Sequence, residues 1–213
     1  MTCCTPAGYR TIFGSRAAER DARRYRRKGL TGTARWLAAT LERTGVADRS
    51  VLEIGGGIGA LQVELLEAGA SQATNVEIID TYESVAHTLV AERGLDERVE
   101  RRVADFASAA DETPPADLLI LHRVICCYPD AGVLVEAACA HAHERVAITI
   151  PREFAWIRLG FAAMNAWFRL RRIEFRGYVH PLDPMLAVAG RRGFHVAERE
   201  RGPLWQSFIL QRG

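Results

Sequence analysis

The stretch that decides the fold is Val51-Leu52-Glu53-Ile54-Gly55-Gly56-Gly57-Ile58-Gly59-Ala60. Its first four residues, apolar apart from Glu53, predict a short buried strand. The glycines predict a tight turn, because glycine allows positive φ and carries no side chain, and residues 61–66 then predict a helix. In open α/β sheets a strand, a glycine-rich turn and a helix bring bare backbone up to a nucleotide-like ligand. The sequence therefore predicts a ligand site at this turn.

Two kinds of ligand fit such a turn. The spacing Gly55-x-Gly57-x-x-Ala60 satisfies the loose dinucleotide fingerprint, which would place a pyrophosphate at the helix N-terminus. The carboxylate of Glu53 disfavours a pyrophosphate and favours a cationic, amino-acid-like ligand. With Glu53-x-Gly55-x-Gly57-x-Gly59, the chain resembles the class I S-adenosylmethionine (SAM) methyltransferases. The resemblance implies SAM as cofactor, bound at Glu53, Gly55, Gly56, Gly57 and Gly59, and NAD binding stays open as an alternative.

Acidic residues follow at the ends of the next predicted strands. Residues 73–78 predict a strand ending near Glu77, whose carboxylate can accept two hydrogen bonds from a ribose diol. Asp80 and Glu83 predict a capping pair for a helix that runs to about Glu92. After a third strand at residues 98–103, the resemblance implies that Asp105 receives the adenine amino group and that Phe106 packs on the ring. The expected cofactor residues outside the glycine loop are Glu77, Ile78, Asp105, Phe106, His122 and Arg27.

The order of elements predicts one α/β domain over residues 1–213. We expect a Rossmann-like, seven-stranded methyltransferase sheet in the family's order 3-2-1-4-5-7-6, with the last strand antiparallel. Residues 1–45 form an N-terminal helical lid, residues 50–150 the SAM-binding core, and residues 151–180 an acceptor-side insertion. Residues 181–213 form a helix, capped by Asp183 with Pro184 at its first position, and a terminal hairpin.

The N-terminal region contains a basic run that admits three interpretations. Arg23, Arg24, Arg26, Arg27 and Lys28 lie within the predicted helix at residues 16–27 or just after it, and a second helix is predicted at residues 33–43. The run can be a solvated helix face, or part of a lid that brings Arg27 near the methionine carboxylate of SAM. It can also bind RNA, although few aromatic residues are interleaved with it.

An aromatic segment follows the predicted fifth strand, residues 146–150. Its members are Phe154, Trp156, Phe161, Trp167 and Phe168. Such a stripe is more often core than binding surface, but this one is richer in aromatic residues than a two-layer contact needs. We expect it either to wall an apolar acceptor pocket or to contact a membrane surface.

Composition agrees with a cytoplasmic enzyme. The chain has 213 residues and a net charge of +2, which does not require a nucleic-acid or membrane partner. The first residues lead into a polar segment without the apolar stretch of a signal peptide. The vicinal cysteine pairs, Cys3-Cys4 and Cys126-Cys127, lack metal-ligand spacing, so we expect reduced thiols and no metal; a metal or redox site uniting the two pairs is the alternative.

Methyl transfer from SAM requires mainly that the acceptor atom and the methyl group be held in line. If a general base is needed, His122 and His180 are the candidates, because imidazole titrates in the useful range. The sequence favours a small apolar or aromatic acceptor. An RNA methyltransferase and a non-catalytic SAM-binding protein are the alternatives.

A narrower resemblance rests on short pieces of the chain. The pieces are Arg27-x-Gly29-x-x-x-Thr33, Tyr128-Pro129, and Val179-His180 before the last helix and hairpin. In these the chain resembles the Mg-protoporphyrin O-methyltransferases, whereas residues 123–127 depart from that family's pattern. The resemblance implies a tetrapyrrole acceptor.

Overall fold

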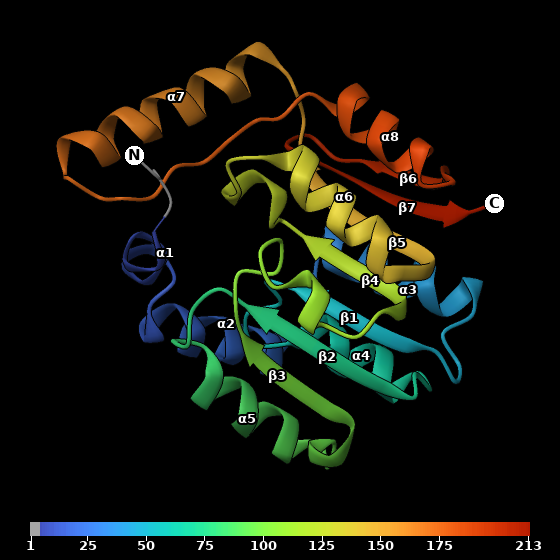
Figure 1. Ribbon diagram of the computed structural model, residues 1–213. Coiled ribbons are helices and arrows are strands. Elements are labelled where there is room, and N and C mark those ends of the chain that lie inside the picture. Colours follow the sequence, from blue (N-terminus) through green and yellow to red (C-terminus); the bar gives the residue numbers. More distant parts are fainter. Residues whose placement is uncertain (1–4) are drawn as a thin grey trace.

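The strands assemble into one seven-stranded sheet in the order β3-β2-β1-β4-β5-β7-β6 (Figure 1). The computed structural model describes residues 5–213. All neighbouring strands are parallel except β7, which is antiparallel to both β5 and β6. The predicted fold class and strand order are therefore confirmed. The strands are β1 (Ser50–Ile54), β2 (Gln72–Glu77), β3 (Val99–Val103), β4 (Ala116–His122), β5 (Ala142–Pro151), β6 (Phe194–Arg201) and β7 (Trp205–Arg212).

Helices cover both faces of the sheet because its central strands are apolar on both sides. In β4, Leu118 and Ile120 belong to a core cluster with α3 (Thr33–Thr44) and α4 (Ala60–Glu67). The alternate residues Leu119 and Leu121 belong to a second cluster with α6 (Ala131–His141) and α8 (Leu182–Arg191). This two-residue alternation is what a strand buried on both faces requires.

The first three helices come before the sheet in sequence; α1 (Pro6–Ile12) and α2 (Ser15–Lys28) lie over one end of it, whereas α3 lies on the opposite side of the view, against a face of the sheet (Figure 1). The predicted helices at residues 16–27 and 33–43 are present as α2 and α3. The shorter helix α1 precedes them and was not predicted from the sequence. Cys3 and Cys4 lie outside the described residues.

Two predicted helix starts are wrong in detail. Helix α5 (Glu83–Glu92) begins after Tyr82, and the predicted capping pair does not form, because the side chains of Asp80 and Glu83 are held by Arg10 and Arg101 instead. Helix α8 begins at Leu182, before Asp183, where the backbone N–H of Leu182 donates to Glu153 at 2.8 Å. A carboxylate from elsewhere in the fold thus accepts the first N–H of α8, whereas at α5 ion pairs hold both acids and no side chain within residues 5–213 caps the first turn.

The aromatic segment forms α7 (Ala155–Leu170), which lies apart from the sheet (Figure 1). Met164 and Phe168 pack on a third apolar cluster that contains Tyr9, Ile79 and Phe175. Asn165 fixes the returning chain by exchanging two hydrogen bonds with the backbone of Gly177, at 2.8 and 2.9 Å. Within residues 5–213 no helix has the length and apolar character needed to cross a membrane.

Candidate functional site

A cavity of about 270 Å³ opens at the carboxyl ends of β1, β2 and β4, where the strand order reverses. Ligands of open α/β sheets bind at this kind of switch point. The floor comes from the glycine loop, Gly55 to Gly57, from Glu77 at the end of β2 and from Ile78 after it. The far wall is formed by Asp105 and Phe106 after β3 and by His122 at the end of β4.

The glycine loop lies too close to its support to carry side chains. A Cβ atom on Gly56 would lie 2.6 Å from a carboxylate oxygen of Glu53, and it would also clash with the amide of Asn75. Gly57 has φ of 60°, a left-handed conformation that favours glycine. The loop therefore presents backbone to the cavity.

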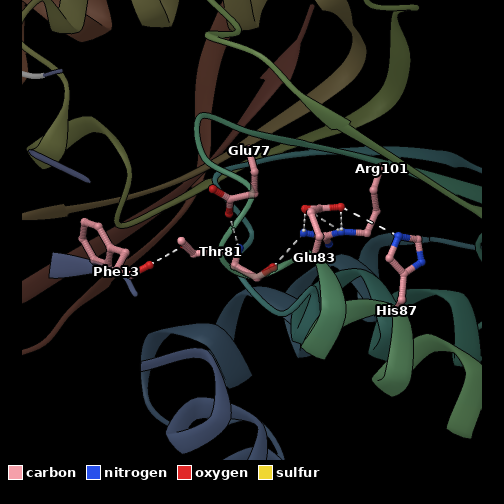
Figure 2. Close-up of polar contacts among 7 residues, drawn as sticks. Phe13, Glu77, Thr81, Glu83, His87 and Arg101 are labelled. Carbon is pink, nitrogen blue, oxygen red and sulfur yellow. Dashed lines mark hydrogen bonds and ion pairs between the residues drawn. The ribbon is translucent and has the colours of Figure 1, made fainter. Parts of the chain in front are cut away.

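Glu77 ties this loop to the second strand. Its carboxylate lines the cavity and accepts the backbone N–H of Gly57 (Figure 2). Burial raises the pKa of Glu77 to about 7, and the N–H of Gly57 and the charge of Arg101 oppose that rise. A carboxylate at this place is positioned to accept hydrogen bonds from a ligand in the cavity.

Arg101 is a site residue that sequence reasoning missed. Its side chain on β3 is only 2% exposed, pairs with Glu83 at 2.8 Å and donates to the carbonyl oxygen of Gly57 at 3.0 Å (Figure 2). In the sequence it belongs to Arg101-Arg102, which resembles a solvated strand edge. The structure instead uses it to brace the glycine loop against α5.

Glu53 lies beneath the loop and does not line the cavity. Its side chain is buried with those of Asn75 and Gln62, and several polar atoms of the three have no hydrogen-bond partner among the described residues. Burial raises the pKa of Glu53 to about 8, opposed by the charge of Arg101. Gly59 also lies outside the cavity, with the amide of Gln62 against its Cα.

Asp105 and Phe106 lie side by side on the cavity wall. The Asp105 carboxylate accepts the backbone N–H of Ala107 at 3.2 Å and the hydroxyl of Tyr128 at 3.3 Å. Phe106 is buried and packs edge-on against His141. The two residues thus combine a fixed acceptor with an apolar surface.

The two candidate histidines differ in position. His122 lines the cavity, and its Nε2 lies 3.0 Å from the hydroxyl of Thr33. Burial, together with the charge of Arg123, lowers the pKa of His122 to about 3. His180 lies outside this cavity, with Nε2 2.9 Å from the carbonyl oxygen of Tyr128 and its ring stacked on Tyr178.

The cation predicted for this site does not line the cavity. Arg27 lies on the exposed side of α2, outside the cavity. Arg123 lines the cavity instead, with a left-handed backbone at φ of 61°. Its guanidinium lies 4.7 Å from the ring centre of Trp205, donates to Thr33 at 3.3 Å and has no ion pair with a carboxylate within residues 5–213. A non-glycine residue in this conformation is uncommon and directs attention to the site.

The vicinal cysteines lie in a short 3₁₀ turn beside the cavity. Cys127 lines it, Cys126 is buried, and their sulfur atoms are 3.8 Å apart, too far for a disulfide. Over residues 5–213, His, Cys, Asp and Glu side chains form no group of three or more that could hold a metal ion.

The N-terminal helices close the cavity from above. Tyr9, Phe13 and Asp21 line it, and the hydroxyl of Tyr9 donates to the carbonyl oxygen of Cys127 at 2.5 Å. The hydroxyl of Thr81 holds the carbonyl oxygen of Phe13 at 2.6 Å (Figure 2). The expectation that the aromatic segment walls the pocket is wrong for this cavity, because no residue of α7 lines it.

No family model matches the chain, and no curated protein matches it either. Among solved structures, it is similar to magnesium protoporphyrin IX methyltransferase from Synechocystis PCC 6803 with bound S-adenosylhomocysteine. The TM-score is 0.70 at 18% identity, covering 96% of this chain and 100% of that one. An O-methyltransferase family protein from Burkholderia thailandensis gives 0.71 at 18% identity, covering 96% and 63%.

A proposed RNA methyltransferase from Pyrococcus horikoshii is also similar, with a TM-score of 0.57 at 15% identity, covering 84% of this chain and 83% of that one. Proteins with different named acceptors thus share this architecture, and a fold does not select an acceptor. The chain has the fold of the class I methyltransferases.

Proposed function

We propose that the protein is a methyltransferase that uses SAM to methylate a small-molecule acceptor. The observation that carries the proposal is the convergence of the glycine loop, Glu77 and Asp105-Phe106 on one cavity of the methyltransferase sheet. The bare loop backbone leaves room for a ligand, and the polar groups beside it suit a nucleoside. SAM supplies a methyl group that is already activated.

Each predicted binding residue is assigned a task in this proposal. Glu77 binds the ribose hydroxyls, Asp105 the adenine amino group, and Phe106 packs on the adenine ring beside Ile78. Arg123 takes the role first expected of Arg27 and binds a carboxylate, because it is the arginine among the residues that line the cavity and it has no ion pair with an acid within residues 5–213. Glu53 supports the loop from below.

Neither candidate histidine is well suited to act as a general base. An imidazole whose pKa is about 3 is a weak base and a poor proton acceptor at neutral pH. We therefore assign His122 an orienting role next to Thr33. His180 lies outside the cavity. Catalysis then rests on alignment and exclusion of water, which suits an acceptor that carries no proton at neutral pH, such as a carboxylate.

The acceptor side of the cavity is aromatic. Tyr9, Phe13 and Tyr128 line it together with the thiol of Cys127. Apolar area buried on these rings stabilises a bound acceptor by about 25 cal/mol per Å². This lining supports an apolar or aromatic small molecule, and the similarity to a tetrapyrrole methyltransferase makes tetrapyrroles the first acceptors to assay.

The cofactor assignment is tested by calorimetric titration with SAM and S-adenosylhomocysteine. We expect both to bind and to raise the melting temperature, since a ligand selective for the folded state stabilises it. Glu77→Ala should weaken binding by about 1–3 kcal/mol, because buried hydrogen bonds to a carboxylate are lost. Glu67→Ala is the matched control, since Glu67 pairs with Arg93 on the surface, away from the cavity.

Unchanged SAM affinity in a folded Glu77→Ala protein would contradict the nucleoside assignment. Binding of NADH in place of SAM would support the dinucleotide alternative. Release of S-adenosylhomocysteine in the presence of an acceptor would separate an enzyme from a non-catalytic SAM-binding protein.

A further inference from the structure

Helix α7 is apolar on two opposite sides. Its inner side, with Ile157 and Phe168 buried, packs on the third apolar cluster. Its outer side carries large residues at steps of three and four, the spacing of one helix face. These residues, which we term the outer face, are Trp156 (59% exposed), Leu159 (71%), Ala163, Trp167 (50%) and Leu170 (80%). Exposed large apolar side chains that gather on one helix face are typical of an interaction surface, so this face is suited to a partner.

Arginines surround the outer face. Arg169, Arg171 and Arg172 are exposed at the C-terminal end of α7 and form no ion pair with a carboxylate within residues 5–213. At the other end, Arg152 lies over the ring of Phe154 with its guanidinium 4.1 Å from the ring centre. Residues 152–176 contain six arginines and only two acids, Glu153 and Glu174.

We propose that α7 is an interfacial helix that binds the protein to an anionic membrane surface. Tryptophan and leucine on one face, with arginine beside them, are the features of helices that lie in the headgroup region. The helix has 16 residues, too few to span a bilayer. A second copy of the chain is disfavoured as the partner, because a symmetric contact through this face would bring two strongly basic surfaces together.

The position of α7 in the fold supports membrane binding through its outer face. It lies outside the sheet layers (Figure 1), so a membrane can contact it without displacing core helices. Its inner residues Met164 and Phe168 share a cluster with Tyr9 and Phe13, which line the cavity. Membrane binding would therefore place the cavity lid near the lipid surface.

The experiment is flotation of the protein with phosphatidylcholine vesicles, with and without phosphatidylglycerol. We expect binding only to the anionic vesicles, weakened by salt. Leu159→Asp with Leu170→Asp should abolish it, whereas Val133→Asp, at an exposed apolar position on α6, should leave it unchanged. Arg169→Gln with Arg171→Gln should weaken it roughly tenfold or more, since each basic residue near such a surface contributes. The control is Arg191→Gln with Arg201→Gln, at exposed positions elsewhere.

Three results would overturn the proposal. The first is absence of binding to anionic vesicles, and the second is wild-type binding by the Leu159→Asp, Leu170→Asp protein. The third is a dimer, seen by sedimentation, that these two substitutions dissociate while vesicles stay unbound, which would assign the outer face to a second copy. Thermal unfolding of each variant without SAM checks that it is folded, so a failure here leaves the proposed function untouched.

Discussion

At the scale of single residues, the buried acids under the glycine loop make stability depend on pH. Folding raises the pKa of Glu53 from its ordinary value of 4.5 to about 8, mainly through burial. Above pH 4.5 the unfolded chain therefore binds fewer protons at this residue than the folded chain. The free energy of unfolding then falls as the pH rises towards about 8.

Glu53→Gln should remove the part of this dependence that Glu53 contributes, while Glu77, with a pKa of about 7, keeps its own part. The ligand-free variant should match the wild type near pH 5 and exceed it near pH 8, by an amount on the order of a few kcal/mol. Thermal melts across this range give the measurement, with Glu67→Gln as a surface control. Parallel melting curves for wild type and variant at every pH would show that Glu53 is not the group responsible.

The sequence predicted the site residues that lie at the ends of strands. It did not predict the site residues whose contacts form only when distant segments of the chain pair. Glu77 and Asp105 were predicted to line one site because parallel strands end at a common edge, and both do. Arg101 was missed because its partner Glu83 and the Gly57 carbonyl come together only when β3 pairs with β2. Arg123 was missed because nothing in its neighbours predicts a left-handed backbone.

At the scale of elements, the boundaries of the sheet strands were largely predictable, whereas the packing of α1 and α7 was not. Periodicity shows which face of a helix is apolar, but it does not show what covers that face. The aromatic stripe of α7 was expected either to wall an acceptor pocket or to contact a membrane surface, and the fold turns half of it to the surface.

Tyr9, Phe13 and Asp21, from α1, α2 and the turn between them, line the cavity, and we expect this segment to act as a lid that sets how fast a ligand leaves. Thr81→Val removes the hydrogen bond to the Phe13 carbonyl that joins the end of α1 to the chain after β2. SAM should then dissociate roughly fivefold faster, the equivalent of about 1 kcal/mol. Thr11→Val is the matched control, since its hydroxyl bonds only within α1, to Ala7 at 3.0 Å.

Stopped-flow displacement of SAM measures both rates. Equal rates in the two variants and the wild type would mean that α1 does not gate the cavity. A change in Thr11→Val alone would trace the effect to the stability of the helix itself.

At the scale of the whole molecule, the distribution of charge favours a small acceptor over RNA. The net charge is +2, and part of the basic run of α2 is already engaged. Arg26 pairs with Glu92 at 2.8 Å, and Arg24 donates to Thr31 at 3.0 Å. A protein that binds RNA through phosphates needs several free cations on one surface, and its affinity then falls steeply with salt.

We therefore expect no specific tRNA binding at physiological salt, measured by filter retention, and no change on Arg23→Gln with Arg27→Gln. The cavity agrees with this, because a base in a helix would have to be flipped out to enter about 270 Å³ beneath α1 and α2. Tight tRNA binding with a steep salt dependence, lost in the double variant, would instead favour the RNA alternative. In that case the basic face of α2 would be the binding surface, and the aromatic lining of the cavity would have to receive a nucleobase.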